Sequence, residues 1–356
     1  MITDIPIKDI PMKRIAYFCA YTPIPIIDAA GYIPYRVLPI TQAQDQAGHL
    51  LHDNMCPHIK RILDRAIAND LPDLYGAIFI NSCDAMRRLS DAWQIVRPDD
   101  HTCIIDLPVD NSSLSIEYLS YEFDQCSQKI SQWTNKEIFD VHLQESIYKM
   151  NELTKTLQMI QKRFITQHPK GGSVLMQELY NDISTSSLSN GLTKSNSFLK
   201  AIDNIPESSR VPIYLFGNVL PDPESFQLFE DCGATIVNDD LCTGSRLFHP
   251  IHCNEQHHIM QCLAQSYLLK PLCARTIHSP DPNHMATQLI QKVQSCQARG
   301  VIGHTIKFCD PYLARLPAIR DALKKEKIPF LLLEGDCTLR SIGQQRTRIE
   351  AFIEML

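Results

Sequence analysis

Short apolar runs alternate with stretches of helical periodicity along this chain, and that alternation restricts the fold more than any other feature. A helical stretch follows most of the runs before the next one begins. Strands that alternate with helices predict an α/β fold with largely parallel sheets. The strand-like runs lie at 14–18, 76–80, 101–108, 211–217, 234–239, 300–306 and 329–336.

The alternation occurs twice, and the two halves differ in sequence. With 356 residues the chain is too long for one typical core. Between the halves lies a helix-rich segment that ends in a polar stretch at 184–197, which is expected to be a loop. We therefore predict two doubly wound parallel-sheet domains, at 1–135 and 209–356, joined by a helical connection and polar loop at 136–208.

Three helix starts are predicted from their capping residues. Asp84 is a good N-cap for the helix after the run at 76–80. Asn54 is a candidate cap for the next helix toward the N-terminus, and Pro57 suits its first turn. Thr347 is the expected cap of the last helix.

Composition and charge exclude several classes of protein. Hydrophobic residues make up 44% of the chain and charged residues 21%, as in ordinary globular proteins. The net charge of −6 gives no electrostatic reason to expect binding to nucleic acid or an anionic membrane. No run approaches the roughly 18 to 20 apolar residues of a membrane span, and the N-terminus lacks the apolar core of a signal peptide. We expect a cytoplasmic protein.

Thirteen cysteines are many for such a chain, and a secreted disulfide framework does not suit its size. Inert buried thiols, redox chemistry and metal ligation remain open. Cys83, Cys242 and Cys309 follow predicted strands at their carboxyl ends, where open α/β sheets place ligands. Cys56 begins a predicted helix, where the helix dipole favours the thiolate, and Cys273 lies in a loop after a helix.

Thiolates that converge in this way are typical of a zinc site or an iron–sulfur cluster. The sequence has no CxxC pair and no ferredoxin-type cysteine run. A widely spaced set drawn from two domains suits a cluster held between them, with packing as the alternative for each cysteine. Cys337 is left undecided, and the segment 249–258, which is rich in histidine, is interpreted as a helix start. The cysteines expected to pack in the core are Cys19, Cys103, Cys126, Cys232, Cys262 and Cys296.

Seven phrases of the sequence carry a resemblance to a known family. The chain resembles the 2-hydroxyacyl-CoA dehydratase D-component family, whose relatives include benzoyl-CoA reductase subunits and double-cubane cluster proteins. The order and spacing of the phrases, which extend to the last residue, carry this resemblance. The phrases are YTPIPIIDAAGYIPYRVLP, NMCPHIKR, FINSCDAMRRLSDAW, NDDLCTGSR, YLLKPLC, IKFCDPY and LLLEGDCTLRSIGQQRTRIEAFIEML.

The resemblance implies two Rossmann-like domains with an iron–sulfur cluster between them, a [4Fe-4S] cluster or a double cubane. Cys56, Cys83 and Cys309 match the three cluster cysteines of the family. Cys242 and Cys273 match positions of the double-cubane branch, which implies that they also contact the cofactor. Two positions depart from the family pattern. Pro25 stands where an acidic residue is expected, and Ile62 stands where cluster-rich relatives have another cysteine.

The family chemistry implied is low-potential one-electron dehydration or reduction of a CoA thioester or another small unsaturated substrate. The electron comes from a separate ATP-hydrolysing iron–sulfur activator, and the chain itself has no GxxxxGK[ST] phosphate loop. The resemblance also implies a homodimer or a heterodimer with a related subunit. The catalytic acid or base is not identified.

Two other functions remain open. The first is a non-catalytic protein that carries a cluster for electron transfer or assembly, and Pro25 is the residue that favours it. The second is a zinc-stabilised α/β binding protein. Turnover with a reduced activator separates the first of these from the enzyme, and metal analysis tests the second.

Overall fold

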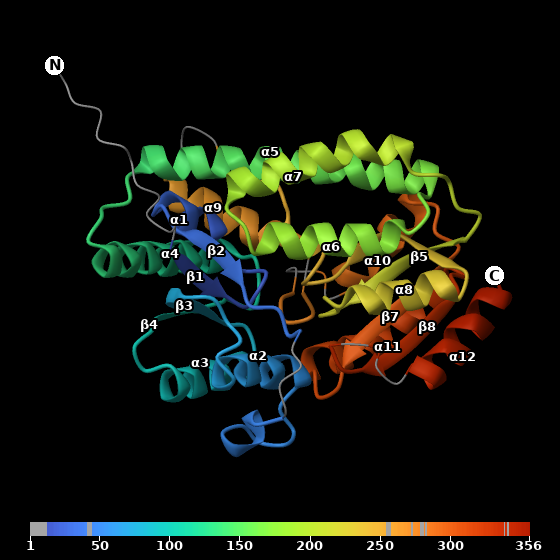
Figure 1. Cartoon of the computed structure of the whole chain (residues 1–356), viewed down its shortest axis with the longest axis horizontal. Coiled ribbons are helices and arrows are strands. Elements are labelled where there is room, and N and C mark those ends of the chain that lie inside the picture. Colours follow the sequence, from blue (N-terminus) through green and yellow to red (C-terminus); the bar gives the residue numbers. More distant parts are fainter. Residues whose placement is uncertain are drawn as a thin grey trace.

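The chain forms two α/β halves that lie side by side beneath a layer of long helices, as seen in a computed structural model (Figure 1). The carboxyl ends of the two sheets approach each other between the halves. The structure describes residues 13–40, 45–253, 258–271, 273–277, 281, 283–337, 339 and 342–356.

The first half is built on a parallel four-stranded sheet in the order β2-β1-β3-β4. Helices α1, α2 and α3 connect its strands, so each successive pair forms a β-α-β unit. The strands are β1 (Arg14–Tyr17), β2 (Ile33–Arg36), β3 (Leu74–Asn81) and β4 (His101–Asp106), and the helices are α1 (Ile24–Ala29), α2 (Pro57–Ile67) and α3 (Asp84–Val96).

The second half repeats this topology with a parallel sheet in the order β6-β5-β7-β8. Both halves therefore confirm the predicted α/β fold with two Rossmann-like parallel sheets. The strands are β5 (Val211–Gly217), β6 (Ala234–Asp240), β7 (Gly300–Ile306) and β8 (Phe330–Gly335), and the helices are α8 (Pro223–Asp231), α10 (His284–Ser295), α11 (Asp310–Lys325) and α12 (Ile342–Glu354).

Five further helices form the layer that joins the halves. In Figure 1, α5 extends over both sheets, and it contacts α1 of the first half and β6 of the second. Helix α9 comes from the second half of the sequence but packs against α4, so that Leu263 shares an apolar core with Ile15 of β1. The helices are α4 (Ser113–Thr134), α5 (Asp140–Gln167), α6 (Gly172–Ser184), α7 (Leu188–Ala201) and α9 (Ile259–Leu269).

The polar stretch at 184–197 was predicted to be a loop, and this prediction is wrong because most of it belongs to α7. Ser187 caps the helix by accepting a hydrogen bond from the backbone N–H of Asn190. Leu188, Gly191 and Ser195 form its buried face, and the helix packs on α5. The small residues that resembled a loop allow close packing between the two helices.

None of the three residues predicted as N-caps occupies that position in its helix. Cys56 rather than Asn54 is the N-cap of α2, with Pro57 in the first turn as expected. Cys83 rather than Asp84 is the N-cap of α3, and Asp84 lies in its first turn, where a carboxylate interacts favourably with the helix dipole. Thr347 lies inside α12.

No helix in the described part of the chain combines the length and apolar character that crossing a membrane requires.

Candidate cluster site between the two sheets

The cavity between the two halves lies at the carboxyl ends of both sheets. The two central strands are β1 and β3 in the first sheet and β5 and β7 in the second. The connections that follow these central strands lead to opposite edges of the sheet. Open sheets bind ligands at such a switch point. Cys19 follows β1 and Cys83 follows β3, while Asn218 follows β5 and Cys309 follows β7. Two switch points thus face one cavity, whose space, including the part open to solvent, is about 620 Å³.

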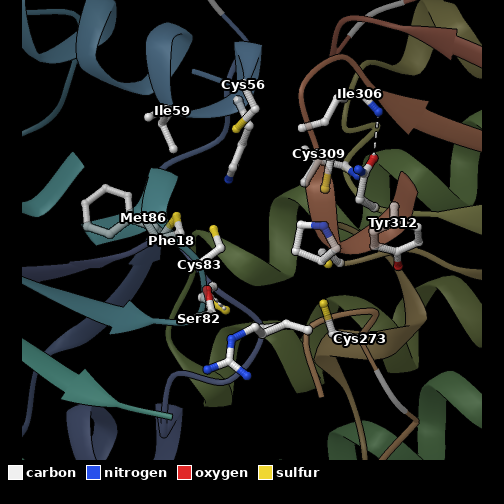
Figure 2. A pocket seen from close by; sticks show the side chains of 18 of the residues that line it. Phe18, Cys56, Ile59, Ser82, Cys83, Met86, Cys273, Ile306, Cys309 and Tyr312 are labelled. Atoms are coloured by element: carbon white, nitrogen blue, oxygen red, sulfur yellow. Dashed lines mark hydrogen bonds between the residues drawn. The ribbon is translucent and has the colours of Figure 1, made fainter. Parts of the chain in front are cut away.

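Thiols are the most frequent polar group in the lining of this cavity. Figure 2 shows the sulfurs of Cys56 and Cys83 on one wall directed toward the same space as the sulfurs of Cys309 and Cys273 on the other. All five cysteines predicted from the sequence line the cavity, together with Cys19. The remaining lining residues are Phe18, Ala20, Arg36, His58, Ile59, Ser82, Met86, Asn218, Val219, Arg275, Ile306, Pro311 and Tyr312.

Cys56, Cys83 and Cys309 share one local structure, because each is the N-cap of a helix. They begin α2, α3 and α11, and the first turns of α2 and α11 each contain a proline. An N-cap side chain lies beside the free backbone N–H groups of the first turn. Three helix starts from both halves therefore direct sulfur and N–H groups into the same cavity.

Burial opposes ionisation of these three thiols. It raises the pKa of Cys56 to about 12 and that of Cys83 to about 11, and it also raises the pKa of Cys309. Backbone N–H groups of the first helical turn lower each pKa, but by less. The helix start therefore does not produce the thiolate expected for Cys56, and metal binding would have to release these protons.

Cys242 and Cys273 form a second group of thiols at the cavity. A hydrogen bond from the Cys273 thiol, assisted by the Arg246 guanidinium, lowers the pKa of Cys242 to about 5 despite its burial. The same interaction raises the pKa of Cys273. Arg246 Nη1 lies 3.0 Å from Cys242 Sγ. The cation and the neighbouring thiol at this end of the cavity therefore favour the thiolate form of Cys242.

Buried cations surround this second group. Arg36 is 1% exposed and donates to the backbone carbonyl of Cys242. Lys270 is 4% exposed, donates to the carbonyl of Ala20 and lies 4.1 Å from the centre of the Tyr21 ring. Burial lowers the pKa of Lys270 to about 7. A buried cation is costly unless an anion offsets its charge, so these side chains suit an anionic occupant.

Several N–H groups at the cavity lack a partner among the described residues. They are Arg36 Nε and Nη2 and Asn218 Nδ2, all on buried side chains. Each such donor costs about 1–3 kcal/mol if it stays unpaired. Thiols, cations and free donors together fit a negatively charged sulfur-rich group, which supplies acceptors for these donors.

The thiols lie around a space and do not meet at one point. Among the described residues, no three histidine, cysteine, aspartate or glutamate side chains approach closely enough to hold a single metal ion. This includes the described part of the histidine-rich segment 249–258, whose residues 254–257 lie outside the described residues.

Sequence reasoning missed several lining residues. Cys19 was assigned to the core, although it follows a strand as Cys83 does, and this position was the available signal. Asn218 carries the same signal after β5. Arg36 gave none, and neither did the buried Lys270 near Cys242, because the sequence does not show that a single basic residue is buried.

The two departures from the family pattern are both buried. Ile62 is fully buried in α2 and belongs to the same apolar cluster as Cys56. Pro25 is buried in the first turn of α1. Cys337, left undecided, is fully buried, and its neighbours include Cys56.

Comparison with known proteins identifies the family. Residues 19–356 match the model of the 2-hydroxyglutaryl-CoA dehydratase D-component. The chain is 22% identical to the beta subunit of (R)-phenyllactyl-CoA dehydratase from Clostridium sporogenes, over 97% of this chain and 92% of that protein. It is also 22% identical to one of the subunits of benzoyl-CoA reductase from Thauera aromatica, over 90% and 84%. For the beta subunit of lactoyl-CoA dehydratase from Anaerotignum propionicum, the identity is 21% over 94% and 90%. The chain belongs to the 2-hydroxyglutaryl-CoA dehydratase D-component family.

Proposed function

We propose that this chain is a subunit of a 2-hydroxyacyl-CoA dehydratase or reductase, in which Cys56, Cys83 and Cys309 hold an iron–sulfur cluster. The observation that carries the proposal is that these three N-cap cysteines, from both halves of the fold, line one cavity. Cubane clusters take one thiolate at each iron, so their ligands surround a volume instead of meeting at one metal ion.

The charges around the cavity support an anionic cofactor. Thiolate-ligated clusters are negatively charged, and Arg36 and Lys270 are buried nearby. Cys242 and Cys273 stand beside them, where they would contact a cofactor that extends beyond the three N-cap thiols. We take a single [4Fe-4S] cluster as the proposed cofactor, since Ile62 supplies no further thiol.

The chain would protect such a group from water and hold it in place. Phe18, Ile59, Met86, Val219 and Ile306 form apolar parts of the lining, and each is buried except where it meets the cavity. Low polarity around a cluster and hydrogen bonds to its sulfurs are the means by which proteins set its potential. When bound, the cluster supplies one-electron chemistry at low potential.

The relatives support an enzyme that acts with partners. Three of them are named as subunits of acyl-CoA dehydratases or of benzoyl-CoA reductase. We infer that the substrate is a CoA thioester or a similar small unsaturated compound. We also infer a second subunit, identical or related, and a separate ATP-hydrolysing iron–sulfur activator, since the chain has no phosphate loop of its own.

The proposal is tested by purifying the protein without oxygen and measuring iron, acid-labile sulfide and the spectrum after dithionite reduction. About four irons per chain are expected, and Cys83→Ala should lose most of them. Cys296→Ala is the control, because Cys296 is a buried thiol in another apolar cluster and does not line the cavity. Zinc or no metal in the wild type, with an unchanged Cys83→Ala variant, would refute the cluster.

A second function is a cluster-carrying protein for electron transfer or assembly that has no substrate pocket. The observation that favours it is Pro25, which replaces the expected acidic residue and is buried in α1. Incubation with a reduced activator and a panel of 2-hydroxyacyl-CoA compounds separates the two functions. Turnover supports the enzyme, and one-electron exchange without turnover supports the carrier.

A further inference from the structure

Asn218 lies at the carboxyl end of β5 and lines the thiol cavity opposite the first half of the fold. Its side chain is 4% exposed, so its amide must find partners inside the protein. Asparagine offers one acceptor oxygen and two N–H donors. The groups that contact its amide oxygen and nitrogen therefore determine the role of Asn218 at the cavity.

The amide oxygen is fully engaged by the backbone. Asn218 Oδ1 accepts the N–H of Val219 at 2.9 Å and the N–H of Ile306 at 3.2 Å, the latter drawn as the dashed line in Figure 2. Two N–H donors at the oxygen fix the orientation of the amide, because a flipped side chain would place donor against donor. The nitrogen Nδ2 must therefore face away from these strands.

The nitrogen has no partner of its own in the described residues, although it is buried. The thiol beside it is that of Cys309, which follows β7, the strand paired with β5, and lines the same cavity. The Asn218 side chain opposes the rise that burial gives the pKa of Cys309. A neutral thiol is a weak acceptor, whereas a thiolate is a strong one. The free donor is thus matched to a charged sulfur, such as a cysteine thiolate that holds a cluster.

We propose that Asn218 is a positioning residue that donates an N–H···S hydrogen bond to the Cys309 thiolate and thereby raises the reduction potential of the group that this thiolate holds. The proposal rests on the cluster proposed above. A donor to a ligand sulfur offsets the negative charge gained on reduction, so the reduced form is favoured.

The test compares midpoint potentials of anaerobically purified proteins at pH 8, followed by the spectrum of the reduced cluster. Asn218→Asp keeps the oxygen that binds Val219 and Ile306 and replaces the donor by a second oxygen. We expect its ratio of reduced to oxidised cluster to fall about tenfold at the potential where wild type is half reduced, which corresponds to a shift of about 59 mV for one electron. Asn218→Ala removes the donor without adding charge and should shift the potential in the same direction by less.

The matched control is Asn151→Leu. Asn151 binds the backbone of Ile251 through both its oxygen and its nitrogen, at 2.8 and 2.9 Å, and does not line the thiol cavity. This variant loses comparable hydrogen bonds and should keep the wild-type potential. Iron-loaded Asn218 variants that titrate like wild type would overturn the proposal.

A metal-free measurement separates this inference from the proposed function. If the wild type carries no iron, the proposed cluster fails, and the rate of Cys309 alkylation by iodoacetamide then tests the hydrogen bond, with peptide mass spectrometry as the readout. Alkylation about tenfold slower in Asn218→Asp than in wild type supports the contact, because the thiolate is the reacting form. Equal rates refute it.

Discussion

Arg246 donates a hydrogen bond from Nη1 to the sulfur of Cys242 at 3.0 Å, and the same guanidinium donates from Nε to Asp240 Oδ1, also at 3.0 Å. Arg246 is 1% exposed and Asp240 6% exposed. One buried cation thus lies between a carboxylate of the second sheet and a thiol of the cavity. Arg246 therefore contributes both to the stability of the second sheet and to the charge at the cavity, so a substitution of Arg246 must affect both.

Arg246→Met is expected to destabilise the fold by about 3–5 kcal/mol, because it leaves the buried Asp240 carboxylate without its main partner. Lys292 remains 3.8 Å from Asp240 and offsets part of the loss. Urea unfolding of the metal-free protein measures the difference in the free energy of unfolding.

The matched control for this prediction is the double variant Arg246→Met with Asp240→Asn. Removing the charge of Asp240 should restore part of the stability that the single variant loses. If both variants are equally unstable, the loss comes from packing of the arginine side chain and not from the ion pair.

Cys242→Ala is expected to keep about four irons per chain, whereas Cys83→Ala loses them. The reason is that Cys242 lies in the loop after β6 and not at a helix start, beside the cations rather than among the three N-cap thiols. Iron and sulfide analysis of the anaerobically purified variants checks this. Loss of half of about eight irons would instead indicate a double cluster with Cys242 as a ligand.

The fold was predictable because it depends on patterns that are local in the sequence. Buried parallel strands are apolar runs, and the sequence shows where such runs alternate with helices. Helix α7 was missed because its buried face consists of Leu188, Gly191 and Ser195, of which the last two have weak helical propensity and pack through small size. The position of α9 on the first half could not be predicted, since its partners in α4 are distant in sequence.

The cysteines of the site were predictable from their place after strands and at helix ends, and all five line the cavity. Their ligand role stays a prediction. The charges around them were not predictable, because Arg36 reaches Cys242 across 206 positions of sequence and Lys270 reaches Ala20 across 250. Such contacts depend on how the two halves pack, which no local pattern specifies.

Ser187→Ala is expected to lower the free energy of unfolding by about 1 kcal/mol, because it removes the side chain that caps α7. Ser189→Ala, at an exposed position in the first turn of the same helix, should change it by less than about 0.5 kcal/mol. Urea unfolding followed by circular dichroism measures both. Equal effects would mean that the hydrogen bond from Asn190 contributes no stability.

Two buried histidines should make the protein less stable below neutral pH. Burial lowers the pKa of His304 to about 4, against a smaller opposing effect of Asp336, and it lowers the pKa of His249 well below 6.5 with help from Lys270. Both histidines therefore stay neutral in the folded protein while the unfolded chain takes up protons. Their full contribution is present above pH 6.5 and is lost as the pH falls from about 6.5 toward 4.

The expected slope is about 1.4 kcal/mol per pH unit for each histidine in this range. His304→Leu should therefore lose less stability than wild type between pH 6.5 and pH 4.5, whatever its stability at pH 7. His142→Gln is the control, since His142 is exposed, and it should follow the wild-type curve. The measurement is urea unfolding of the metal-free protein at half-unit steps of pH. A His304→Leu curve parallel to that of wild type would show that His304 takes up its proton over the same pH range in the folded state as in the unfolded chain.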